Sequence, residues 1–103
     1  MKTNGNGNCY EVAGRLILNA ISDDVFLCHG DVVGMGKIEG IIHGHAWIEI
    51  NNYVIDQSNK NNVYLSTQKY YKLARISGNK VKKYNRKKAL LMMKKTMHFG
   101  PWY

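Results

Sequence analysis

The sequence contains one proline, two cysteines and no apolar run of the roughly 18 residues that a membrane-spanning helix needs. Its first residues are rich in Asn and Gly and include no apolar segment, so we expect neither a membrane span nor a secretory signal. Two cysteines in a chain without such a signal are typical of reduced thiols in a cytoplasm. A disulfide between Cys9 and Cys28 is the minor alternative.

Acidic residues are missing from residues 57–103. All seven acids and only three of the fifteen basic residues lie in 1–56, which gives this part a charge of −4, whereas residues 57–103 carry twelve bases and a charge of +12, for a net charge of +8. A basic half can bind nucleic acid, an anionic lipid surface or an acidic protein. It can also be a solvated face, and we favour this because the lysines are spread over several predicted elements.

The composition, 45% hydrophobic, predicts one compact domain over residues 1–103 with a single small core. Some stretches repeat apolar residues at helical spacing, and others are rich in β-branched and aromatic residues, which predicts an α+β fold. We expect helices over 9–21, 67–75 and 86–97, and strands over 25–33, 43–50, 53–58, 63–65 and 80–84. The last helix is expected to pack on the sheet.

The segment HGHAWIEINNYVIDQS, residues 43–58, predicts a β-hairpin. Asn51 and Asn52 separate two β-rich runs, and asparagine readily adopts the positive φ of a two-residue turn. The expected pairs are Ile50–Tyr53, Glu49–Val54, Trp47–Asp56 and His45–Ser58. Because side chains alternate along a strand, His45 and Asp56 share a face as diagonal neighbours and can form a hydrogen bond. A carboxylate in this position orients an imidazole and stabilises its protonated form.

Cys9 is the candidate nucleophile for this histidine. It follows the Asn/Gly loop NGNGN, residues 4–8, and opens the predicted helix over 9–21, with Asn8 as the expected N-cap and Glu11 in the first turn. Backbone N–H groups at a helix start, together with a nearby imidazolium, stabilise a thiolate. An unreactive core cysteine is the alternative.

Three further residues are predicted to line the same site. His43 lies on the face of His45 and is the alternative base, and Trp47 either shields the His–Asp pair from water or fills the core. Cys28 and His29 point to opposite faces because they are adjacent on a strand, so they cannot readily form a catalytic pair. We expect Cys28 in the core and His29 at the cleft.

The sequence leaves alternatives for two further features, a metal site and the donors for an oxyanion. The His-x-His pair could bind zinc, but no CxxC or HExxH spacing supports a metal site, so we expect no metal and no other cofactor. An acyl-transfer site also needs donors for the oxyanion. The backbone N–H of Cys9 is the first candidate, and the side chain of Asn8 or Asn4 is the second.

The strings GNCYEVAG, GHAWIEI and YVIDQS together resemble the papain-like cysteine hydrolase superfamily, in its transglutaminase-like and cell-wall-peptidase-like branches. The strings LCHGDVVGMGKIEG and HFGPW also resemble small papain-fold proteins of phage and bacterial genomes. The resemblance implies a papain-like α+β core, with Cys9 as nucleophile, His45 as general base and acid, and Asp56 as the orienting group. Many superfamily members carry a glutamine shortly before the cysteine as oxyanion donor, whereas this chain has asparagines there.

These observations favour a cysteine-dependent amide hydrolase or acyltransferase that acts on a protein or peptide in a cytoplasm, that of the host if the chain is phage-encoded. Superfamily members hydrolyse peptides, deamidate glutamine or cross-link amines through one thioester, and the sequence does not select among these reactions. The alternative is a papain-like binding module whose basic half binds nucleic acid or an acidic host protein. A metal-dependent hydrolase is the third hypothesis.

Overall fold

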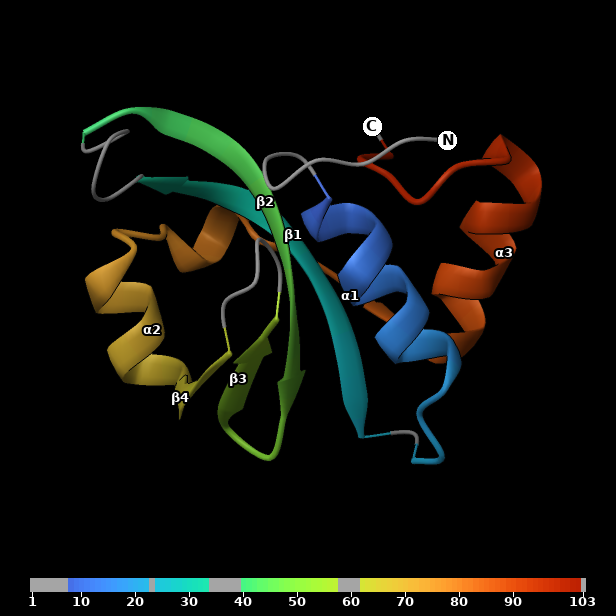
Figure 1. Cartoon of the computed structure of the whole chain (residues 1–103), viewed down its shortest axis with the longest axis horizontal. Helices are drawn as coiled ribbons and strands as arrows, with labels where there is room; N and C mark the ends of the chain where they lie inside the picture. The colour runs from blue at the N-terminus through green and yellow to red at the C-terminus, as the bar shows by residue number, and fades with distance from the viewer. Residues whose placement is uncertain (1–7, 23, 34–39, 58–61, 103) are drawn as a thin grey trace.

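The structure is a computed structural model, and it describes residues 8–22, 24–33, 40–57 and 62–102. These residues form three α-helices, a five-stranded sheet and one short 3-10 helix (Figure 1). In chain order the elements are α1 Cys9–Leu18, β1 Val25–Val33, β2 Ile42–Ile50, β3 Tyr53–Asp56, β4 Val63–Ser66, α2 Thr67–Leu73, η3 Gly78–Lys80, β5 Lys82–Asn85 and α3 Arg86–Thr96. The prediction of an α+β fold is therefore confirmed.

The five strands run in the order β4-β3-β2-β1-β5, and every neighbouring pair is antiparallel. Helices α1 and α3 lie on one side of the sheet and α2 lies on the other (Figure 1). We call these sides the α1 face and the α2 face. A sheet covered on both faces buries the central strands completely, and the central part of β2, His45–Glu49, is buried at five successive positions.

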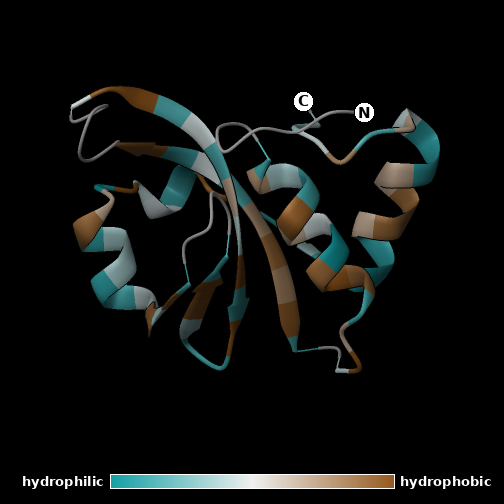
Figure 2. Cartoon of the chain, in the orientation of Figure 1, coloured by the Kyte–Doolittle hydropathy of each residue, from teal (hydrophilic) through white to brown (hydrophobic). Residues whose placement is uncertain are grey.

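Each face of the sheet has its own hydrophobic cluster. On the α1 face the cluster contains Ile17 of α1, Leu27 and Ile48 of the sheet, and Ala89 of α3. On the α2 face the buried members are Cys28, Val32, Trp47, Val54 and Tyr70. Figure 2 shows the hydrophobic residues concentrated on the strands, while the helices alternate between hydrophobic and hydrophilic positions, as expected for helices that cover a sheet. No helix among the described residues is long and apolar enough to cross a membrane.

The predicted hairpin forms with the predicted turn, and the pairs next to the turn have the predicted register. The expected pair Trp47–Asp56 is not part of the ladder, and Ser58 lies outside the described residues. Asn51 and Asn52 both have positive φ, 51° and 67°. The ladder between β2 and β3 contains the pairs Ile50–Tyr53, Glu49–Val54 and Ile48–Ile55. Two successive positive φ values give the type I′ turn, whose twist matches that of the flanking strands. This local geometry fixes which face each hairpin side chain joins.

Side chains cap two of the three helices. Ser66 accepts a hydrogen bond from the Lys69 backbone N–H at the start of α2, and Asn85 accepts one from the Lys88 backbone N–H at the start of α3. Asn8 occupies the predicted N-cap position of α1, where its side chain makes no capping bond.

Candidate active site

Cys9, His45 and Asp56 lie together in the structure. His45 Nε2 lies 2.7 Å from Asp56 Oδ2, and the Cys9 thiol is close enough to the His45 side chain to act on its pKa. Because Nε2 is taken by the carboxylate, Nδ1 is the ring nitrogen that remains for the sulfur. All three residues are at most 7% exposed. The sequence predicted these three, and the structure brings all of them into one cluster.

The thiol and the imidazole reach each other from different faces of the sheet. α1 packs on the α1 face, whereas His45 lies on the α2 face with Trp47, because it pairs with Gly30 across β1 and alternates with Ala46. The ladder between β2 and β3 stops at Ile48–Ile55, so the part of β2 that carries His45 lies beyond it. Cys9, Ala46, Trp47 and Asp56 line one small void at this point. The end of the ladder thus provides the opening through which the sulfur contacts the ring.

The hydrogen bonds of His45 stabilise its protonated form. Burial alone would lower its pKa, but the hydrogen bond and negative charge of Asp56, together with the hydrogen bond and charge of Cys9, raise the pKa to about 9. An imidazole with this pKa is protonated at neutral pH.

Tyr70 is a member of the site that the sequence analysis missed. Its hydroxyl donates a 2.8 Å hydrogen bond to Asp56 Oδ2, the same oxygen that contacts His45. Burial and the negative charge of Asp56 raise the pKa of Tyr70 far above its usual value, so the phenol stays protonated and remains a donor. The helical spacing of α2 indicated only an apolar patch, because the sequence does not tell which face of the sheet α2 covers.

Trp47 lines the site, as predicted, and its indole N–H belongs to a network of polar side chains centred on Glu49. Its ring stacks on His45 with centroids 6.1 Å apart, and its indole N–H donates to Glu49 Oε2 at 2.9 Å. Glu49 also accepts from the Tyr71 hydroxyl at 2.5 Å and pairs with Lys83 at 3.0 Å. Burial alone would raise the pKa of Glu49. The hydrogen bonds from Tyr71, Trp47 and Lys83 have the larger effect, so the pKa of Glu49 is lowered. Glu49 was expected to reach water near the turn, and instead it is 7% exposed.

The other residues predicted at the site are His43, Asn8 and Asn4. The His43 ring lies 6.0 Å from that of His45, and its Nδ1 lies 3.2 Å from the Gly44 carbonyl oxygen. Asn8 precedes the nucleophile directly in the chain, and Asn4 lies outside the described residues. Among the residues that the structure describes, no three His, Cys, Asp or Glu side chains gather into a metal site. Both cysteines are free thiols, so the alternative of a Cys9–Cys28 disulfide is wrong.

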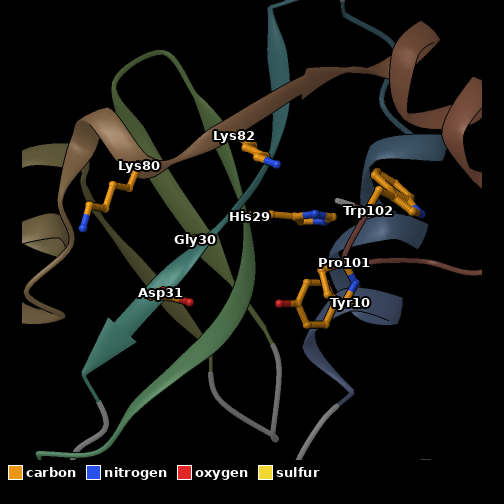
Figure 3. Close-up of a pocket in the computed structure, with 8 residues that line it drawn as sticks. All are labelled: Tyr10, His29, Gly30, Asp31, Lys80, Lys82, Pro101 and Trp102. Atoms are coloured by element: carbon orange, nitrogen blue, oxygen red, sulfur yellow. The ribbon is translucent and has the colours of Figure 1, made fainter.

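His29 does not line the thiol site, and this prediction is wrong. It pairs with Ala46 across the β1–β2 ladder and therefore points to the α1 face, opposite to His45. There its ring lies between the rings of Tyr10, Tyr84 and Trp102, at centroid distances of 4.9, 5.2 and 4.9 Å. Figure 3 shows it on the wall of a separate pocket. The expectation that Cys28 is a core residue is confirmed, since it is fully buried on the α2 face.

These features define an α+β protein whose antiparallel sheet carries a buried Cys–His–Asp cluster with a tyrosine behind the carboxylate. No family model, no curated protein and no solved structure matches this chain.

Proposed function

We propose that the protein is a cysteine-dependent amide hydrolase or acyltransferase with Cys9 as nucleophile, His45 as acid and base, and Asp56 as the orienting group. The observation that carries the proposal is one imidazole that is hydrogen-bonded to a carboxylate and lies close to a thiol. We also propose that the fold is a papain-like core, which is supported by a helix that begins at the cysteine and by adjacent antiparallel strands that carry the other two groups.

In the proposed reaction the sulfur of the thiolate attacks the carbonyl carbon of an amide. The carbonyl π electrons move to oxygen, and His45 gives its proton to the amide nitrogen as the C–N bond breaks. An amine leaves and a thioester remains on Cys9. In hydrolysis a water molecule then attacks the thioester, with His45 accepting its proton; in acyl transfer a second amine takes the place of water.

The developing oxyanion needs donors close to the sulfur. The backbone N–H of Cys9 lies in the first turn of α1, where the helix itself supplies no acceptor for the N–H groups. We propose this N–H as one donor. The side chains of Asn8 and Asn4 remain the candidates for the second.

Alkylation by iodoacetamide at pH 6.5 tests the proposal, and Cys28 is the internal control. Cys9 is 4% exposed, so the reagent has to be small, and Cys28 is fully buried with its pKa raised by burial and by Glu49. We expect Cys9 to be modified while native Cys28 is not, and we expect His45→Gln to slow Cys9 modification at least tenfold. Mass spectrometry of the two cysteine peptides measures both rates.

Equal rates at Cys9 and at an unfolded cysteine peptide of the same sequence, unchanged by His45→Gln, would contradict the proposal. Substrate class is then sought by incubating the original protein with cell lysate, stopping the reaction with acid and identifying acyl groups on Cys9 by mass spectrometry. The Cys9→Ala variant is the matched control, because it keeps the fold and removes the sulfur.

A second candidate, a binding module, is favoured by the surface of α3. Its exposed positions include Arg86, Lys87, Lys88, Lys94 and Lys95, and no acidic residue follows Asp56 in the sequence. Such a surface attracts nucleic acid or an acidic protein. Salt-sensitive retention on immobilised nucleic acid, equal in the original protein and in Cys9→Ala, would support this function; retention that does not change between 50 and 200 mM salt would contradict it.

A further inference from the structure

A pocket of about 120 Å³ lies on the α1 face, apart from the thiol site (Figure 3). Its walls come from three distant parts of the chain: β1, the start of α1 and the C-terminal segment, with η3 and β5 at the rim. The lining residues are Tyr10, His29, Gly30, Asp31, Lys80, Lys82, Pro101 and Trp102. This volume holds several water molecules, so the pocket accommodates a small group rather than a nucleotide or a peptide segment.

His29 in the wall of this pocket is a buried polar side chain without a partner. It is 5% exposed, and neither Nδ1 nor Nε2 forms a hydrogen bond. An unsatisfied buried donor or acceptor costs about 1–3 kcal/mol, and buried polar groups in proteins are nearly always paired. The chain nevertheless packs tightly around the ring, since a Cβ at Gly100 would come 2.6 Å from its Cε1. An enclosed imidazole with two unused nitrogens indicates a missing partner.

The charged side chains around the pocket indicate which kind of group could be the hydrogen-bond partner of His29. Lys80 and Lys82 stand on one side, and Lys82 extends over the His29 ring in Figure 3. Asp31, the one acid that lines the pocket, points toward the Tyr10 hydroxyl on the side away from Lys82. The His29 end of the pocket is therefore cationic and offers N–H donors.

We propose that this pocket binds a small oxyanion, a carboxylate or a phosphate, through Lys82 and His29. The anion supplies the acceptor that the imidazole lacks and neutralises the lysine side of the pocket. The site is separate from the proposed catalytic cluster, because Cys9, His45 and Asp56 are not among the described residues that line this pocket.

The titration of His29 gives a direct measurement of occupancy. In the empty pocket burial and the positive charge of Lys82 lower the pKa of His29 to about 4, with Asp31, Lys80 and the phenols of Tyr10 and Tyr84 as its other charged or titratable neighbours. A bound anion counteracts both the burial of the ring and the charge of Lys82, so it raises the pKa of His29. Each unit of increase means that the anion binds tenfold more tightly to the form with protonated His29 than to the form with neutral His29.

The experiment follows the Cε1–H resonance of His29 by NMR while sodium phosphate or sodium acetate is added at constant ionic strength. Saturation with one of them is expected to raise the pKa of His29 by about one unit or more. The resonance of His98, which is exposed and lies outside the pocket, is the internal control. The response to acetate against phosphate distinguishes a carboxylate from a phosphate. An unchanged pKa in both titrations overturns the proposal.

Charge variants make the test specific. Lys82→Gln is expected to weaken anion binding about tenfold, and Lys87→Gln on α3, which is exposed and outside the pocket, to leave it unchanged. Asp31→Asn is expected to bind the anion as tightly as the original chain or more tightly, because it removes a like charge. Weaker binding in Asp31→Asn, or equal losses in Lys82→Gln and Lys87→Gln, overturns the assignment. Repeating the titration with Cys9→Ala keeps the outcome separate from the fate of the proposed enzyme.

Discussion

Asp56 accepts hydrogen bonds from His45 and Tyr70 on a single carboxylate oxygen. Its negative charge is one of the causes that raise the pKa of His45, whereas burial acts in the opposite direction. In Asp56→Asn the amide keeps the shape and can still accept from the ring, but it carries no charge. We therefore expect the pKa of His45 to fall from about 9 toward 6.5 or below. NMR titration of the His45 ring protons measures this change.

The same variant predicts a chemical result. With a neutral His45 at pH 7.5, the imidazolium that stabilises the thiolate is lost, so we expect alkylation of Cys9 to slow by tenfold or more. Glu49→Gln is the matched control, since it also neutralises a buried carboxylate of the same sheet but has no hydrogen bond to His45. An unchanged His45 pKa in Asp56→Asn would show that the carboxylate does not stabilise the imidazolium.

Tyr70 is a positioning residue at this scale, because it touches the carboxylate and not the sulfur. Tyr70→Phe removes the hydroxyl and leaves a buried carboxylate with one donor fewer. We expect the free energy of unfolding to fall by about 1–3 kcal/mol. Urea denaturation measures this, with Tyr64→Phe as control because Tyr64 is 64% exposed. If Tyr70 only fills space, the two variants will be equally stable and the His45 titration will not change.

The hairpin of β2 and β3 is the element that brings His45 and Asp56 together. Asn52 has a φ of 67°, which glycine adopts freely and a β-branched residue does not. We expect Asn52→Gly to retain stability and alkylation rate, and Asn52→Val to lose about 1–2 kcal/mol of unfolding free energy. Because a changed turn moves the register of β3, Asn52→Val should also weaken the His45–Asp56 bond and lower the His45 pKa. Equal behaviour of the two variants would show that the turn does not set the register.

Elements with local sequence signals were predicted correctly. The strand predicted over 25–33 matches β1, and Asn8 occupies the predicted N-cap position of α1. Alternation along a strand also placed Cys28 and His29 on opposite faces. The first helix ends at Leu18, three residues before its predicted end, because Asn19 donates both its backbone N–H and its side-chain amide to α1 carbonyl groups.

The remaining features depend on packing between distant segments. The sequence places Tyr70 on a helix but does not say that α2 covers the face of Asp56, and the burial of Glu49 depends on Lys83 and Tyr71 from two other elements. The surroundings of His29 depend on the C-terminal Trp102, which is 4% exposed. These contacts join residues at least 14 positions apart in the chain, and no local periodicity in the sequence reports on them.

At the scale of the whole molecule, the sheet separates two buried histidines whose pKa values move in opposite directions. His45 on the α2 face is stabilised as a cation, and its pKa rises to about 9. His29 on the α1 face is enclosed beside Lys82, and its pKa falls to about 4. Both shifts link protonation to folding, since the unfolded chain binds protons with a pKa near 6.5 at both positions.

The two linkages predict a maximum of stability near pH 6.5. The contribution of His45 is complete below pH 6.5 and is lost as the pH rises through about 9, a loss on the order of 3 kcal/mol. The contribution of His29 is complete above pH 6.5 and is lost as the pH falls toward 4, together with that of Glu49, whose pKa is lowered. Urea denaturation between pH 4 and 9.5 measures the curve. His45→Gln should flatten its alkaline arm and leave the acidic arm in place, because only His45 titrates between 6.5 and 9 with a shift of this sign. An alkaline arm of equal slope in His45→Gln would mean that the imidazolium is not held by Asp56 and Cys9, and the case for a preformed catalytic ion pair would be lost with it.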